Sequence, residues 1–187
     1  MSRVAKSTLF LLTSISALAA EIVVDFEKAA VLLQPNDKAH RVEQWVEKDV
    51  VFKLAHAPKQ SQAKGLVMFF EHLSNGHKGI ASAMALEAIP VRATLPKAAS
   101  SVTVAFWGST ATPALLEAFD SEGKVVDRVS MASIPGRKTP GEPVPIFSMT
   151  VKAPKIAYVQ FSGPRPGEYL AADELRFTPS EEAGSSR

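Results

Sequence analysis

The chain has 187 residues, of which 46% are hydrophobic and 21% charged, a composition typical of one globular domain and not of a disordered segment. It contains no cysteine, which excludes disulfide bonds, zinc–thiolate sites and a cysteine nucleophile. The formal net charge of +2 falls to zero for residues 21–187: without Arg3 and Lys6, 19 basic side chains stand against 19 acidic ones. Neither nucleic-acid binding nor attraction to an anionic membrane is therefore expected.

The first twenty residues have the three parts of a secretory signal peptide. Arg3 and Lys6 supply positive charge, residues 8–15 form an apolar segment, and Ala17 and Ala19 provide the small-x-small pattern that a signal peptidase needs. The apolar segment is much shorter than the roughly 20 residues that span a bilayer, which disfavours an uncleaved anchor. The sequence predicts a leader over residues 1–20, cleaved after Ala19 or Ala20, and a secreted or periplasmic product with no membrane insertion.

After the leader, apolar and polar residues alternate with a period of two, which predicts half-buried β-strands. Residues 39–48 also permit a short helix or an irregular crossover, and residues 81–88 are rich in alanine but run into a proline. The apolar residues of the expected strands are Ile22, Val24 and Phe26; Val50, Phe52 and Leu54; Val102, Val104 and Phe106; Val125, Val129 and Met131; Phe147, Met149 and Val151; and Leu175 and Phe177.

Glycine and proline separate these strands. Residues 120–124 predict a hairpin turn in which Gly123 takes positive φ, and residues 95–97 predict another turn. Four prolines between residues 135 and 145 predict a long loop. Short strands joined by turns indicate an all-β, antiparallel two-sheet sandwich. We expect one domain over residues 22–178 and a disordered tail over residues 179–187.

From residue 102 onward, the order of motifs resembles bacterial exported jelly-roll sandwiches of the galactose-binding-like type. The resemblance implies an antiparallel two-sheet jelly roll, often with a structural calcium ion and often binding glycans through loops at one end. The matching residues are Asp120, Gly123, Val125 and Val126 in a hairpin; Ile156, Val159, Phe161, Ser162 and Gly163 in a strand; and Asp173, Glu174, Leu175 and Phe177 in the closing strand.

In the resembled proteins, an acid in the closing strand and one from the first strand help to hold calcium, which implies Asp173 with Asp25 and Glu27 here. Strand parity places Asp173 on the core-facing side, where a carboxylate is costly unless it is paired, capped or metal-bound. Carboxylate oxygens are ligands that suit calcium. The alternative is that Asp173 caps loop amides or pairs with Arg165 or Arg176, without a metal.

Glycan sites combine an aromatic platform with planar polar groups, because sugars present apolar C–H faces and a rim of hydroxyls. The candidate ligand-binding residues are Trp107 before one loop, Arg137 in the proline-rich loop, and Arg165 and Tyr169 around a third. The alternative for Trp107 is a place in the core, and Tyr158, within an apolar strand, is predicted to be a core residue.

Catalytic patterns are weaker. His72 and His77 could meet a metal together with Glu71, but their spacing is no zinc signature and a solvated turn explains it better. Ser109 follows a glycine but lacks the second glycine of a nucleophile elbow. No catalytic residue is therefore assigned.

The sequence thus predicts an exported, all-β jelly roll that acts as a non-catalytic binding or adhesion module, with glycan as the leading ligand class. A second hypothesis is a structural or protein-interaction domain of an envelope or extracellular assembly, whose partner is an envelope protein. A third is a small secreted hydrolase that uses acids near Asp173 or His72.

Overall fold

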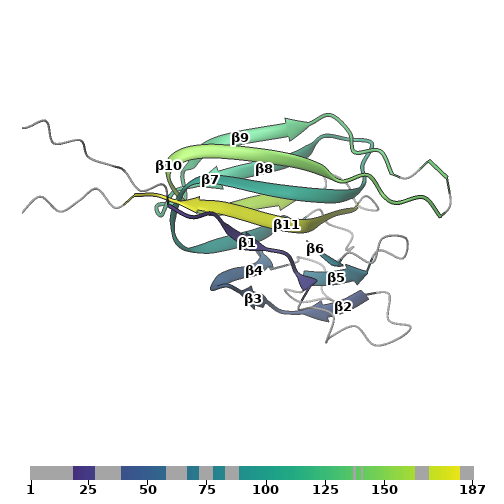
Figure 1. Cartoon of the computed structure of the whole chain (residues 1–187), viewed down its shortest axis with the longest axis horizontal. Helices are drawn as coiled ribbons and strands as arrows, with labels where there is room; N and C mark the ends of the chain where they lie inside the picture. The colour runs from purple at the N-terminus through teal and green to yellow at the C-terminus, as the bar shows by residue number, and fades with distance from the viewer. Residues whose placement is uncertain are drawn as a thin grey trace, which may run out of the picture.

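The computed structural model describes residues 19–27, 39–57, 67–71, 78–82, 89–136, 138–139, 141–162 and 169–181. These residues form eleven β-strands and no α-helix (Figure 1). The strands are β1 (Ile22–Val24), β2 (Ala39–Val42), β3 (Trp45–Glu47), β4 (Val50–Leu54), β5 (Val67–Glu71), β6 (Lys78–Ser82), β7 (Val91–Ser109), β8 (Ala114–Phe119), β9 (Val125–Met131), β10 (Phe147–Ser162) and β11 (Tyr169–Pro179).

The strands follow the alternation of the sequence. Val50, Phe52 and Leu54 of β4 are buried, and β7 and β11 repeat this pattern, as predicted. All pairings in the described part are antiparallel, in one hydrogen-bonded sheet of order β2-β5-β6-β11-β7-β10-β8-β9. Off this path, β1 pairs with β11, β3 with β4, and β4 with β7. The all-β, antiparallel class is confirmed.

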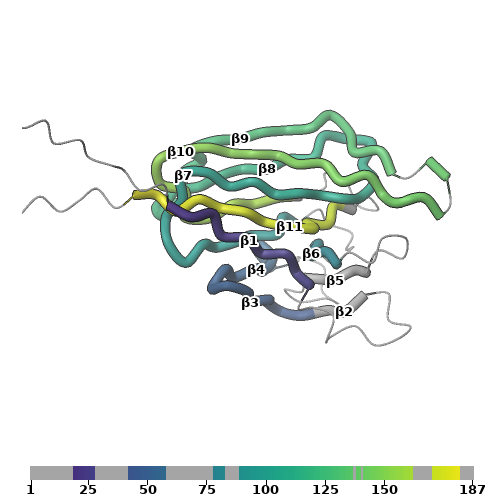
Figure 2. Tube along the Cα trace, viewed as in Figure 1, coloured from purple at the N-terminus to yellow at the C-terminus, as the bar shows by residue number. Residues whose placement is uncertain are grey.

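Two long strands, β7 and β10, organise the fold (Figure 2). They pair along their lengths, but the register shifts where residues 95–98 of β7 and residues 153–155 of β10 lie. The first half of β7 lies between β4 and β10, whereas the second half lies between β10 and β11. The predicted turn at residues 95–97 is therefore wrong, because β7 continues through these residues with an irregularity.

The core lies between the strands that pair with the two halves of β7. The rings of Phe26, which follows β1, and Phe52 on β4 meet edge to face with centroids 5.0 Å apart. Phe106 on the second half of β7 meets Phe161 on β10 in the same way at 5.4 Å. All four rings are buried, and burying each one stabilises the fold by about 1.5–3 kcal/mol.

One of two hairpin turns was predicted from the sequence, and the other was not. Gly123 has a φ of 85° in the β8–β9 turn, and the Asp120 carboxylate accepts the Lys124 N–H at 2.9 Å, so this predicted turn is confirmed. Lys48 and Asp49 connect β3 to β4 with φ values of 48° and 62°, which is a type I′ turn without glycine. Residues 39–48 thus form strands and a connection, and the helix alternative is wrong.

Backbone contacts hold the last residues that the structure describes. β11 extends to Pro179, and Ser180 donates its N–H to the Ala98 carbonyl at 2.8 Å, so ordered contacts continue past the predicted boundary at residue 178. Residues 1–18 of the predicted leader and residues 182–187 of the predicted tail lie outside the described residues. In the described residues, no helix has the length and apolar character to cross a membrane.

Candidate binding site

Trp107 is interior. Its side chain is 2% exposed and packs with Ala81, Val144 and Ala171, in a small cluster distinct from the main core. A Cβ on Gly79 would lie 2.9 Å from the indole Nε1, so the absence of a side chain at Gly79 makes room for the ring. The ring therefore presents no platform to solvent, which agrees with the core alternative for Trp107.

The loop site predicted from the sequence is only partly described. Tyr169 lies opposite Ser109 in the β11–β7 register, two residues from Trp107 along β7. A Cβ on Gly136, the residue before Arg137, would lie 3.4 Å from the Ser109 Cβ. The backbones of Tyr169 and Gly136 thus meet the same end of β7. Arg137, Arg165 and the side chain of Tyr169 lie outside the described residues, so this loop site stays a prediction.

The proposed calcium ligands do not gather into one set. The exposed Asp25 carboxylate accepts the Glu27 N–H at 3.3 Å, and the Glu27 carboxylate lies 3.6 Å from the Lys78 ammonium. In the described part of the chain, no group of three acidic or histidine side chains could hold a metal ion. Calcium stays a prediction, which titration of the chelated protein tests: no binding heat and no change in Tm would remove it.

A β-bulge changes the expected position of Asp173. The β11–β7 register shifts between Ala172 and Glu174, so Asp173 is the extra residue. Ala172 and Leu175 both belong to the core cluster although two residues separate them. Because the bulge interrupts the alternation, strand parity alone does not fix the face on which the Asp173 side chain lies.

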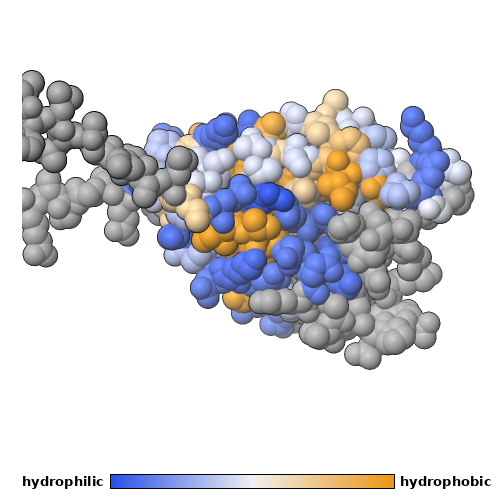
Figure 3. Space-filling view, viewed as in Figure 1, coloured by the Kyte–Doolittle hydropathy of each residue, from blue (hydrophilic) through white to orange (hydrophobic). Residues whose placement is uncertain are grey.

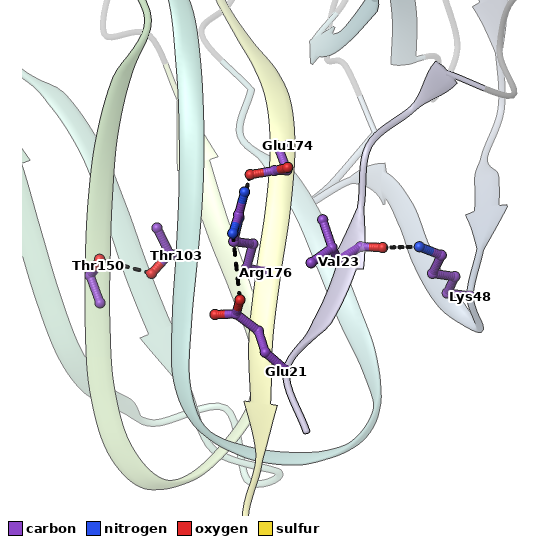
Figure 4. Close-up of polar contacts among 7 residues, drawn as sticks. All are labelled: Glu21, Val23, Lys48, Thr103, Thr150, Glu174 and Arg176. Atoms are coloured by element: carbon purple, nitrogen blue, oxygen red, sulfur yellow. Dashed lines mark hydrogen bonds and ion pairs between the residues drawn. The ribbon is translucent and has the colours of Figure 1, made fainter. Parts of the chain in front are cut away.

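Arg176, the predicted alternative partner of Asp173, forms ion pairs with two other acids (Figure 4). It contacts the adjacent Glu174 carboxylate and lies 3.6 Å from Glu21, just before β1. The hydrogen bond to Glu174 raises the pKa of Arg176 above its ordinary value. These contacts tie β1 to β11. The space-filling view of Figure 3 shows a hydrophobic patch that is bordered by hydrophilic residues on the face turned to the viewer.

Histidines supply no metal centre in the described part of the chain. His72 and His77 lie outside it, as does the side chain of Glu71, so their predicted role is untested. His56 is exposed and lies after β4, where its Nδ1 is 3.2 Å from the Ala57 carbonyl oxygen.

A row of polar side chains, which sequence analysis did not single out, crosses five strands. Lys53 on β4 lies opposite Arg92 on β7, which lies opposite Gln160 on β10. Gln160 lies opposite Glu117 on β8, which lies opposite Arg128 on β9. We call these five residues the polar row. Because neighbours along a strand point to opposite faces, the row lies on the outer face; the core-facing neighbours are Phe52, Leu54, Val91, Ala93, Leu116, Ala118, Val159 and Phe161.

Tyr158 holds one member of this row in place. Its ring stacks on Phe119 with centroids 4.7 Å apart and planes 6° apart, and the Arg92 Cζ lies 3.5 Å from its centroid. Since β10 lies between β7 and β8, the tyrosine lies between the arginine and the phenylalanine. Tyr158 is buried, as predicted, but by this stack on the outer face and not by the main core.

Charge is compensated at one end of the row and not at the other. The Arg128 guanidinium contacts the Glu117 carboxylate, with Nη2 at 2.5 Å and Nε at 2.8 Å from the same oxygen. Lys53 and Arg92 form no ion pair with any described residue. The buried Nε of Arg92 also has no hydrogen-bond partner among the described residues. The β4 end of the polar row is therefore cationic.

A hollow of about 640 Å³ adjoins this cationic end. Ala55, one of its lining residues, donates its N–H to the Pro90 carbonyl at 2.9 Å, a backbone hydrogen bond that joins the end of β4 to the segment before β7. Apolar and polar groups both line it. The described lining residues are Glu43, Gln44, Lys53, Leu54, Ala55, His56, Ala57 and Arg92.

Strand parity could have placed four members of the polar row on an outer face, because buried apolar residues flank Lys53, Arg92, Glu117 and Gln160. The pairing of strands that are far apart in sequence could not be predicted from parity. Lys53 and Arg92 are neighbours only because β4 pairs with β7 in one register, and a shift of one residue would separate them.

No protein family and no curated protein matches the sequence. Among solved structures, the chain is similar to the K1 cleaved adhesin domain of Lys-gingipain from Porphyromonas gingivalis W83, with a TM-score of 0.38, 12% identity and coverage of 86% of this chain and 99% of that one. It is also similar to apo BiXyn10A CBM1, with a TM-score of 0.40, 11% identity and coverage of 87% and 99%.

A third similar structure is the arabinose-bound α-L-arabinofuranosidase MgGH51. The TM-score is 0.35 at 13% identity, and the match covers 89% of this chain but 27% of the enzyme. Likenesses at these scores assign neither a ligand nor an activity, so the proposal below rests on the residues of this chain.

Proposed function

We propose that the chain is a non-catalytic binding module whose ligand is a glycan, bound at the hollow and along the polar row beside it. The observation that carries this proposal is the opening of the hollow onto Lys53 and Arg92, two members of the row. The volume of about 640 Å³ falls within the range of small-ligand sites. A sugar presents hydroxyls and apolar C–H faces, and the described lining offers polar groups beside small alanine surfaces in place of a Trp, Tyr or Phe platform.

The residues divide this work by their chemistry. The Arg92 guanidinium and the Lys53 ammonium donate hydrogen bonds to hydroxyl oxygens, while the Gln160 amide both donates and accepts. Ala55 and Ala57 offer small apolar surfaces to the C–H face of a sugar ring. Strand pairing fixes the backbone positions of the row, so no backbone segment has to be ordered when a ligand binds.

We further propose that the strands form the two layers of a jelly roll, and that the protein is exported. The layers are the strands on either side of the Phe106–Phe161 and Phe26–Phe52 contacts. Pairing of β1 begins at Ile22, so cleavage after Ala19 or Ala20 would leave this strand complete. Export is tested by sequencing the N-terminus of the mature protein, and a product that begins at Met1 would contradict it.

Glycan binding is tested by screening the mature protein on a glycan array and measuring hits by isothermal titration. We expect binding that falls by about tenfold or more in Arg92→Ala, because a hydrogen bond to a charged group contributes about 1.5–3 kcal/mol. Thr103→Ala is the matched control. Its hydroxyl bonds to Thr150 at 2.9 Å, away from the polar row (Figure 4). A blank array, or equal loss in both variants, would contradict the proposal.

A protein-interaction role is the second candidate, and exposed valines on β9 favour it. Val125 and Val126 are 39% and 36% exposed. Capture of an envelope protein that is lost in Val126→Lys, with glycan arrays blank, would support this role over glycan binding. Turnover of chromogenic glycosides would instead support the hydrolase hypothesis.

A further inference from the structure

We propose that the glycan is acidic, and that its carboxylate binds between Lys53 and Arg92 at the hollow. A uronic acid is the sugar class with this chemistry. This inference rests on the proposed glycan-binding function and names its ligand class.

The first argument is the juxtaposition of two positive charges. Lys53 and Arg92 are direct cross-strand partners, a position in which side chains begin about 5 Å apart and like charges destabilise the pair. Glu117 compensates Arg128 further along the row, but no described carboxylate pairs with Lys53 or Arg92. An anion bound between the two would relieve this repulsion.

The second argument is the position of the guanidinium over an aromatic ring. Arg92 stacks on Tyr158, with its Cζ 3.5 Å from the ring centroid. A stacked guanidinium keeps its N–H donors in its own plane, where a planar carboxylate can accept two of them side by side. The stack holds this group before the ligand arrives, which lowers the entropic cost of binding.

The third argument is the charge balance of the hollow. Its described lining contains Lys53 and Arg92 against one carboxylate, that of Glu43. Coulomb attraction therefore favours an acidic sugar over a neutral one, and Glu43 opposes it in part. This arrangement predicts the direction of an effect: removal of the Glu43 carboxylate should raise the affinity for acidic ligands and leave the affinity for neutral ones nearly unchanged.

The experiment is isothermal titration of the full mature protein with trisaccharides of galacturonate, glucuronate and mannuronate, each beside its neutral carboxyl-reduced counterpart. We expect at least one acidic trisaccharide to bind about tenfold or more tighter than its counterpart, with affinity that falls as salt is raised. Neutral sugars that bind as well as acidic ones would overturn this inference but leave glycan binding standing. Absence of binding by either kind, together with a blank glycan array, would overturn both.

Four variants identify the site. Lys53→Met and Arg92→Lys should each lower the affinity for the acidic trisaccharide by about tenfold. In Arg92→Lys the charge is kept, but the planar guanidinium that binds a carboxylate through two N–H groups is lost. Glu43→Gln should raise the affinity for the acidic trisaccharide severalfold, a gain that disturbance of the fold would not give. Lys97→Met removes an exposed lysine that does not line the hollow and should change nothing. Equal affinities across all four proteins would overturn the assignment.

Discussion

The Arg92 guanidinium lies 3.5 Å from the centre of the Tyr158 ring, on the outer face of the strands that pair with the first half of β7. The contact links stability to the proposed function, because the stack that covers Tyr158 also holds a cation at the edge of the hollow. Substitutions of Tyr158 should therefore affect both properties.

Tyr158→Leu should lower the free energy of unfolding by about 1–3 kcal/mol, since it removes one cation–π contact and one stacked aromatic pair. It should also weaken glycan binding, because Arg92 loses its support. Tyr158→Phe keeps the ring and should retain both the stability and the binding of the natural protein. Urea unfolding and isothermal titration measure the two effects. A leucine variant with unchanged affinity would show that the stack does not position the arginine.

Lys53→Met should raise the stability of the ligand-free protein while it weakens binding. The substitution relieves repulsion with the opposing Arg92 and keeps an unbranched chain of similar length. The thermal midpoint, measured at low salt, should increase, and the difference should shrink at high salt because ions screen the repulsion. A lower midpoint at low salt would mean that the two cations do not repel as the register implies.

Phe106→Ala tests the core between the two halves of β7. The ring is fully buried and meets Phe161 at 5.4 Å, so its removal should cost about 3–5 kcal/mol. Phe106→Leu, which leaves a smaller cavity, should cost much less. Denaturant unfolding gives both values. A small effect of the alanine variant would contradict packing of these strands against each other.

The two hairpin turns give a paired test of backbone strain. Asp49 has a φ of 62°, where glycine carries no Cβ penalty, so Asp49→Gly should stabilise the protein by up to about 1 kcal/mol. Gly123 has a φ of 85°, so Gly123→Ala should destabilise it by about 1 kcal/mol or more. Opposite signs in thermal unfolding are expected. Stability changes of the same sign in both variants would contradict the positive φ at one of the two turns.

The fold class could be predicted because period-two alternation is a local signal, repeated in β4, β7 and β11. The irregular positions could not. Residues 95–97 contain Pro96 and resemble a turn, yet β7 passes through them because its two halves have different partners. The turn at Lys48 and Asp49 has no glycine to mark it, and the bulge at Asp173 is set by pairing with β7.

The site was harder to predict than the fold for the same reason. Trp107 was a candidate ligand-binding residue because it is an aromatic residue beside a loop, but its ring is buried in the space left by Gly79. Arg92 and Lys53 are unremarkable in sequence and become a pair only through the β4–β7 register. Long-range strand pairing, which no local pattern encodes, creates the proposed site.

Mapping of the ligand by nuclear magnetic resonance tests the central claim most directly. The ¹⁵N-labelled protein is titrated with the trisaccharide that binds best, and changes in amide chemical shift are followed along the chain. We predict that the largest changes fall at Lys53, Arg92 and Gln160. Changes centred on Ser109 and Tyr169, at the loop end of β7, would contradict this placement of the site.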